Sequence, residues 1–373
     1  MKAAAHHSLA SLTGIALFLG ALVGVSSALA TPSAVTGVTY GTESNGTNVD
    51  VNNIIYDNRS QTVSTISTAT ENYVFDGPAA SNVYFRRGST GSNGATAWYQ
   101  GTDFDSGSGG YTVYGQGDSS PTLSELMLTS NLSEGLRNPF ANTVSSSSIG
   151  PTSNIERIDF YFGSGGYTVK DGAALVFFDL ENFGNHGDGF RIAAFNGWNT
   201  STNVVTSYVN TGLLVAPGSY GDGLDVPGSQ NNIGYIRSTT TNGDNLSGTQ
   251  SVTTIDSDVS GSLGSSDLTI VGILISFADL GLNVGDVIYG YSLMAGDVVA
   301  SNASQLIDYT NTSVYLNTTN AGSNPDADYG NVDFAAFGAK ISRPVPEPAT
   351  YGAVFLAGIT TLFAWRRRPA RTA

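Results

Sequence analysis

The chain has 373 residues, of which 30 are acidic and 15 are basic, so its formal net charge is −15 at pH 7. A surface with this excess of negative charge repels nucleic acids, and no DNA or RNA partner is expected. The chain contains no cysteine, which excludes disulfide bonds, thiol catalysis and metal sites built on cysteine.

The N-terminal thirty residues have the layout of a secretory signal peptide. Leu12 to Val25 is an apolar stretch that follows a minimal positive start. Ala28 and Ala30 form the small-x-small pattern of a cleavage site. The sequence therefore predicts export, with residues 1–30 removed and a mature chain that begins at Thr31.

Residues 31–343 are expected to form an acidic, β-rich ectodomain of one large or two small sub-domains. Short apolar or alternating segments recur between clusters of Gly, Asn, Asp and Ser. This spacing favours a β-sandwich with jelly-roll or immunoglobulin-like layers. Ile155 to Phe162 alternates as a half-buried strand does, and Leu268 to Phe277 is apolar enough for a central strand. The other expected strands are Val51 to Tyr56, Asn72 to Phe75, Asn82 to Arg86, Ala173 to Leu180, Phe190 to Phe195, Val204 to Val209, Ile233 to Ile236, Asp286 to Met294 and Val332 to Ile341.

One or two short helices interrupt the expected strands. Ser120 to Leu128 offers a capping serine, Pro121 in the first turn and Glu125 near the start. These are the signals of a helix N-terminus. A second short helical turn could begin at Leu132 and end at Gly135.

No catalytic constellation stands out, and no catalytic residue is assigned. His186 is the single histidine after the signal segment, and it lies in a turn without a Gly-x-Ser-x-Gly motif elsewhere in the chain. Asp179 and Glu181 would share one face of an extended strand, so paired-carboxylate glycoside hydrolysis stays open as an alternative. No local signature selects an acid and a nucleophile.

A polar segment from 256 to 267 matches the oxygen-ligand pattern of a calcium loop. Its ligand positions are occupied by Asp256, Asp258, Ser260 and Asp267, with glycine at the sixth position. The usual loop closes with glutamate, and the flanking segments resemble strands. A polar turn between strands is therefore the alternative, and calcium is the only cofactor suggested.

Two tryptophans are candidates for sugar binding. Trp98 and Trp198 could serve as stacking platforms for a polysaccharide. Aromatic residues in a sandwich are more often part of its core, and that interpretation stays beside the first.

The last thirty residues, 344–373, combine three features in a fixed order. A proline-locked motif comes first, made of Pro346, Glu347 and Pro348. The uncharged run from Ala349 to Trp365 follows and is long enough to cross a membrane as a helix. A basic cluster ends the segment and would stay on the cytoplasmic side, with Arg366, Arg367 and Arg368 as its residues.

This tail resembles the PEP-CTERM sorting signal of bacterial exosortase substrates. The resemblance covers residues 346–373 and implies transient anchoring in the inner membrane and cleavage near the motif by an exosortase. It also implies delivery to the cell surface or extracellular matrix of an exopolysaccharide-producing bacterium. The expected function is that of a non-enzymatic surface or matrix protein. The alternatives are a carbohydrate-binding protein of the biofilm matrix and, second, a secreted glycoside hydrolase.

Overall fold

The structure is a computed structural model of residues 1–373. It divides the chain into two units, Met1–Ala30 and Thr31–Ala373. All described residues belong to the second unit. They are 31–41, 49–51, 54–56, 63–88, 95–101, 103–107, 110–114, 124, 127–128, 132, 135–136, 139–140, 155–179, 187–226, 234–240, 245–247, 268–316, 332, 334–335 and 340–345.

The prediction of a mainly β fold is confirmed. Within the described residues the fold has 49% strand and nearly no helix, and its sheets are curled and antiparallel. The composition explains this preference, because Gly, Ser, Thr and Asn are poor helix formers and Val, Ile, Phe and Tyr favour strands. With no disulfide available, the fold depends on packing and on polar contacts.

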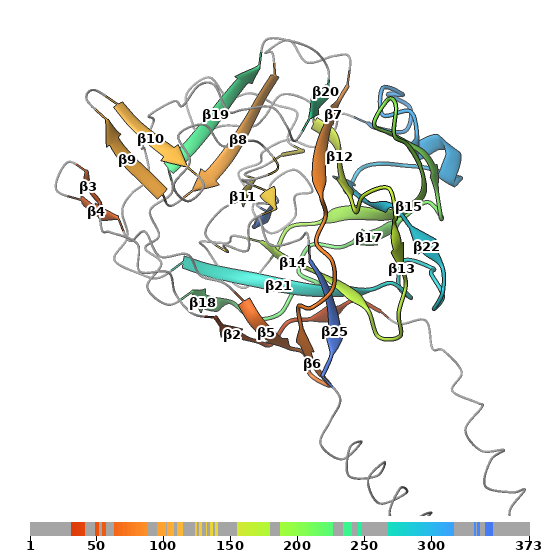
Figure 1. The fold of residues 1–373 in the computed structure, drawn as a ribbon, viewed down its shortest axis with the longest axis horizontal. Coiled ribbons are helices and arrows are strands. Elements are labelled where there is room, and N and C mark those ends of the chain that lie inside the picture. Colours follow the sequence, from red (N-terminus) through yellow and green to blue (C-terminus); the bar gives the residue numbers. More distant parts are fainter. Residues whose placement is uncertain are drawn as a thin grey trace, which may run out of the picture. The chain divides into compact units, whose positions relative to one another are not determined.

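The larger sheet has twelve strands, among them the long neighbours β14 (Ala174–Asp179) and β21 (Leu268–Ser276) (Figure 1). These two pair from Ala174 opposite Ser276 to Asp179 opposite Val271. The remaining strands of this sheet are β1 (Ser33–Ala34), β2 (Gly37–Tyr40), β5 (Val63–Ser67), β6 (Asn72–Val74), β8 (Ala95–Gly101), β11 (Gly135–Leu136), β18 (Leu224–Val226), β19 (Gly234–Thr240), β24 (Phe334–Ala335) and β25 (Ile341–Pro344).

The second sheet has seven strands, with β12 (Ile155–Tyr161), β23 (Gly290–Ala295) and β15 (Phe190–Asn199) side by side in its middle. It is completed by β7 (Asn82–Arg87), β16 (Val204–Tyr208), β17 (Leu213–Val215) and β20 (Asn245–Ser247). Three small pairs and a 3-10 helix complete the described elements: β3 (Val49–Val51) with β4 (Ile54–Tyr56), β9 (Asp103–Gly107) with β10 (Gly110–Tyr114), β13 (Tyr167–Thr168) with β22 (Val287–Ile288), and η1 (Ala303–Leu306).

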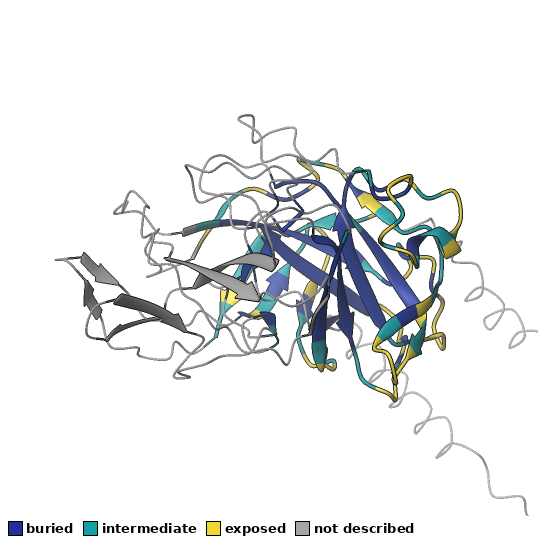
Figure 2. Cartoon of the chain, turned by 90° about the horizontal axis from the view of Figure 1, so that it is seen from above, coloured by how far each residue is buried: buried dark blue, intermediate teal, exposed yellow. Residues whose placement is uncertain are grey.

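Both faces of the central strands are buried. On β14, Leu175 and Phe177 belong to one apolar cluster, whereas Val176 and Phe178 belong to a second one. Buried residues run continuously along β12, β14 and β23, and exposed residues are frequent in the connecting turns (Figure 2). The expectation that Leu268 to Phe277 forms a central strand is thus confirmed, since β21 has paired strands on both sides and alternates between the same two clusters.

Aromatic rings join the two large sheets. The ring of Phe177 lies 5.4 Å from that of Phe190 and 5.7 Å from that of Tyr291, both in edge-to-face geometry. Phe177 belongs to β14, whereas the other two rings come from β15 and β23 of the seven-stranded sheet. Edge-to-face pairs contribute beyond the area that they bury, so this contact ties one sheet to the other.

The half-buried character predicted for Ile155 to Phe162 is wrong. All seven residues of β12 are buried, including charged residues on the face that was expected to meet solvent. The reason is tertiary, because the segment 298–316 supplies partners for this face from a distant part of the chain. Alternation along a strand reports which residues share a face, and it does not report what covers that face.

Three expected strands are each divided in two. Val51 to Tyr56 overlaps the pair β3 and β4, Asp286 to Met294 covers β22 and most of β23, and Val332 to Ile341 covers β24 and only the first residue of β25. At the start of β23 the backbone comes very close to β12. A Cβ atom on Gly290 would lie 1.9 Å from the Phe160 carbonyl oxygen, so only glycine fits there.

The expected helix from 120 to 128 is described only in part. Ser124 and Met127 are helical, and the Leu128 amide donates a hydrogen bond to the Ser124 carbonyl at 2.8 Å. The signal segment 1–30 and the apolar run 349–365 lie outside the described residues. Among the helices that the structure does describe, none has the length and hydropathy needed to cross a membrane.

The inter-sheet contact yields a prediction about stability. Phe177→Ala should lower the free energy of unfolding by about 3–5 kcal/mol, because it removes a fully buried ring and leaves a cavity between the sheets. The control is Leu214→Ala at an exposed position, which should change it by less than about 0.5 kcal/mol. Urea unfolding followed by intrinsic fluorescence measures both values. Equal effects of the two variants would contradict the role of Phe177.

Candidate functional site

The best-defined polar arrangement in the described residues is a buried cluster on the seven-stranded sheet. Arg157 and Asp159 lie two positions apart on β12 and so point to the same face. Arg86 of β7 is opposite Arg157, and Ser292 of β23 is opposite Asp159. We call these four residues and Tyr208 of β16 the Asp159 cluster.

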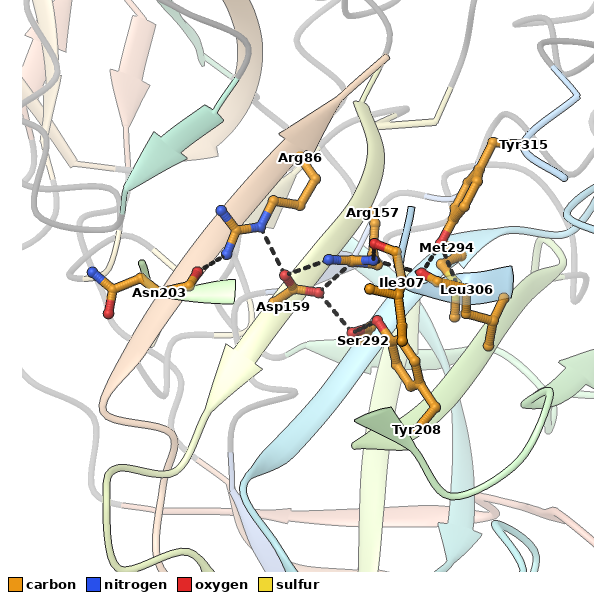
Figure 3. A network of polar contacts seen from close by, with 10 residues as sticks. All are labelled: Arg86, Arg157, Asp159, Asn203, Tyr208, Ser292, Met294, Leu306, Ile307 and Tyr315. Atoms are coloured by element: carbon orange, nitrogen blue, oxygen red, sulfur yellow. Dashed lines mark hydrogen bonds and ion pairs between the residues drawn. The ribbon is translucent and has the colours of Figure 1, made fainter. Parts of the chain in front are cut away.

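Asp159 is the acceptor at the centre of this cluster (Figure 3). Its carboxylate accepts hydrogen bonds from Arg157 Nε at 2.7 Å and from Arg86 Nε at 2.8 Å. A second Arg157 nitrogen, Nη2, donates at 3.2 Å, and Ser292 Oγ donates at 2.6 Å. Because the carboxylate is fully buried, these contacts replace the water that it would otherwise bind.

The two guanidinium groups extend the cluster to distant parts of the chain. Arg157 Nη1 donates to the carbonyl oxygens of Leu306 at 2.6 Å and Ile307 at 3.1 Å, at the end of η1. Arg86 Nη2 donates to the carbonyl oxygen of Asn203. The cluster therefore connects three neighbouring strands with the 298–316 segment and with the turn between β15 and β16.

The charges in the cluster stabilise one another. Burial is the largest influence on Asp159 and would raise its pKa, but the neighbouring Arg157 and Arg86 outweigh it and lower the pKa. Burial would likewise lower the pKa of Arg157, whereas Asp159 and two nearby tyrosines raise it well above its ordinary value. Asp159 and Arg157 are thus both charged at neutral pH. Both oxygens of Asp159 already accept hydrogen bonds, so the arrangement serves as a cross-link.

Glu156, next to the cluster, has a different environment. It lies at a β-bulge, where the register between β12 and β7 shifts between Ile155 and Arg157. Its side chain is buried against Gly88, where a Cβ atom would come within 2.6 Å of Glu156 Oε1. Burial, and to a smaller extent repulsion from Asp297, raises the pKa of Glu156 to about 8. This carboxyl group therefore titrates near physiological pH.

Trp198, the candidate sugar platform, lies within a group of aromatic rings near the end of β15. Its indole is stacked on Tyr161 at 4.5 Å and on Phe195 at 5.5 Å, and it contacts Tyr84 at a tilted angle. The residue is half-buried. The backbone of Trp98, the other candidate, belongs to β8, and its side chain lies outside the described residues.

Asp179, a candidate carboxylate for hydrolysis, is buried at the end of β14. Its Oδ2 accepts a hydrogen bond from the Asp188 amide at 2.7 Å, and Tyr220 donates to the Asp188 carbonyl at 2.9 Å. These contacts order the chain that leads into β15. Glu181 and His186 lie outside the described residues.

The remaining predicted sites also fall outside the described residues and stay predictions. They are the calcium positions Asp256, Asp258, Ser260 and Asp267, the cleavage residues Ala28 and Ala30, the motif Pro346, Glu347 and Pro348, and the basic residues Arg366, Arg367 and Arg368. Within the part of the chain that the structure describes, no group of three or more His, Cys, Asp or Glu side chains could hold a metal ion.

The Asp159 cluster has no clear signature in the sequence. Its one local signal is the pair of opposite charges at alternate positions of β12, which is equally typical of a solvated strand face. Arg86 and Ser292 are 73 and 133 residues from Asp159, and no pattern in the sequence relates them to it.

Comparison with known proteins gives no further assignment. No protein-family model matches the chain, and neither the curated proteins nor the solved structures include one with significant similarity to it.

The cluster predicts a large effect of a small substitution. Asp159→Asn keeps the shape of the side chain but leaves two buried guanidinium groups without a counter-charge, so the free energy of unfolding should fall by about 3–5 kcal/mol. Chemical denaturation of the purified protein measures the loss. The control is Asp76→Asn, which removes an exposed ion pair with Arg343 and should leave the midpoint nearly unchanged. A loss no larger than that of the control would contradict the structural role of Asp159.

The raised pKa of Glu156 predicts that the stability of the fold depends on pH. Because its pKa rises from 4.5 to about 8 on folding, the folded state holds the proton more tightly than the unfolded state. The contribution of Glu156 to the free energy of unfolding is fully present below pH 4.5 and is lost as the pH rises through about 8. Melting temperatures from pH 5 to pH 9 should fall less steeply in Glu156→Gln than in the wild type. The exposed Asp308→Asn variant should keep the wild-type slope, and an unchanged slope in Glu156→Gln would refute the assignment.

Proposed function

We propose that this chain is a non-enzymatic, exported surface or extracellular-matrix protein that an exosortase sorts and processes. The observation that carries the proposal is the order of features at the C-terminus, where Pro346, Glu347 and Pro348 precede the apolar run 349–365 and a basic cluster. The signal-peptide pattern of residues 1–30 supports it, because both segments direct a protein to the membrane.

The arrangement of the body is consistent with this proposal. Contacts between Phe177 of one large sheet and the rings of Phe190 and Tyr291 of the other favour a β-sandwich. The charged side chains of the Asp159 cluster are engaged in internal hydrogen bonds that hold strands together. A cross-linked, cysteine-free β body suits a protein that has to persist outside the cell.

A carbohydrate-binding protein of the matrix is the second candidate. Trp198 favours it, because this half-buried indole lies between the exposed residues Asn196 and Asn199, whose amides could bind sugar hydroxyls. Stacking of Trp198 on Tyr161 limits the ring surface that a sugar could contact. Binding on a glycan array that is lost in Trp198→Phe, with an unchanged melting temperature, would favour this candidate over the first.

The proposed processing is tested on the native protein. Mass spectrometry of both termini, combined with cell fractionation, should find a chain that starts at Thr31, lacks residues 349–373 and resides at the cell surface or in the medium. Glu347→Ala should retain the tail and accumulate in the inner membrane. Recovery of the intact tail in the wild-type surface protein would contradict processing. Turnover of a polysaccharide by the purified protein would contradict the non-enzymatic assignment.

A further inference from the structure

The strand that directly precedes the Pro-Glu-Pro motif is an interior strand of the larger sheet. β25 lies between β14 and β6 (Figure 1). Ile341 and Ser342 are opposite Leu175 and Ala174 of β14, and on the other side Arg343 and Pro344 are opposite Val74 and Tyr73 of β6. The pairing continues beyond the strand, because the Val345 amide donates to the Asn72 carbonyl at 2.7 Å. Ordered pairing thus extends past the expected domain boundary at residue 343 and includes Val345, the last described residue.

The side chains of β25 are integrated as well. Ile341 is 1% exposed, and the buried Ser342 donates from Oγ to the Ala174 carbonyl at 3.1 Å. Arg343 forms an ion pair with Asp76. Pro344 packs closely on Gly172, where a Cβ atom would lie 2.6 Å from the proline ring. Removal of this strand would therefore expose β14 and part of the core.

The N-terminal end of the body joins the same sheet. β1 pairs with β21, where Ser33 is opposite Leu274, and the Val35 amide donates to the Gly272 carbonyl at 2.9 Å. Val35 is completely buried. Since β21 pairs with β14 and β14 with β25, the order across the sheet is β1, β21, β14, β25. Both the first and the last of the described strands are thus fixed in one sheet.

The register places the chain before β1 and the chain after β25 at the same end of the strands of that sheet. Leu274, the partner of Ser33, is opposite Val176 of β14, and Ser342 is opposite Ala174 of β14. The chain that enters β1 and the chain that leaves β25 both lie toward the N-terminal end of β14. Three spacings of about 4.8 Å separate β1 from β25, so the two ends are roughly 15 Å apart.

We propose that proteolytic processing leaves β25 intact and is confined to the chain beyond Val345. β25 then remains a permanent strand of the mature protein. A protease needs an extended, unpaired substrate, and a bond within a strand that is paired along its length becomes accessible only when the sheet opens. The inference rests on the proposed function for the existence of processing, whereas the pairing of the chain through Val345 follows from the fold alone.

Limited digestion of the full-length protein tests the boundary. The chain is purified from membranes in a mild detergent, digested with proteinase K and followed by intact-mass spectrometry. The persistent product should end at or beyond Val345. Early products that end between Lys340 and Pro344 would overturn the proposal.

A pair of variants isolates the contribution of the last hydrogen bond. Val345→Pro removes the amide that donates to Asn72, whereas Val345→Ala keeps that amide and changes only a side chain that is 41% exposed. Cleavage within 341–344 should be roughly two- to tenfold faster in the proline variant, the cost expected for one net hydrogen bond. The alanine variant should behave as the wild type. Equal cleavage rates in the two variants would count against a protected β25.

The C-terminus of the native mature protein separates this inference from the proposed function. A native C-terminus within β25 would overturn the inference and leave processing intact. A native chain that retains residues 349–373 would overturn the processing, and the digestion experiment would still decide whether β25 is protected.

Discussion

The buried carboxylate of Asp159 is the interaction on which the seven-stranded sheet depends. Arg157 and Arg86 are both buried, and Asp159 supplies the negative charge that makes their burial tolerable. Through Arg157 it also fixes the carbonyl groups at the end of η1. Without this group, two buried guanidinium groups would lack a counter-charge. A chain without cysteine thus uses a charged cross-link where other proteins use a covalent one.

The larger sheet is stabilised differently, by apolar burial on both faces. β14 and β21 alternate between two hydrophobic clusters, and strands from both ends of the body are attached to them. The sheet is therefore complete only when the last described strand, β25, pairs with β14. This dependence relates folding to processing, because the same strand that completes the sheet leads directly into the proposed sorting motif.

Much of the β structure could be predicted from local sequence. Leu268 to Phe277 is apolar at almost every position, and it forms a central strand as expected. Two kinds of error have physical causes. The expected strand Val332 to Ile341 covers β24 and only the start of β25, and these two strands pair with different segments of β14. β12 is buried on both faces, because segment 298–316 supplies partners for one of them. That segment is about 150 residues away in the chain and therefore leaves no trace in the local alternation.

The sequence by itself determined the β class and the positions of most described strands. Each of these depends on short-range properties such as alternation, turn residues and the length of an apolar run. Only the tertiary structure decided that Arg157 and Asp159 are buried and that Trp198 is stacked among other rings. It also decided that β1 and β25 belong to one sheet and have their outer ends on the same side. The physical reason is that burial and pairing depend on partners far away in the chain, and a strand with alternating charges looks the same whether water or another segment covers it.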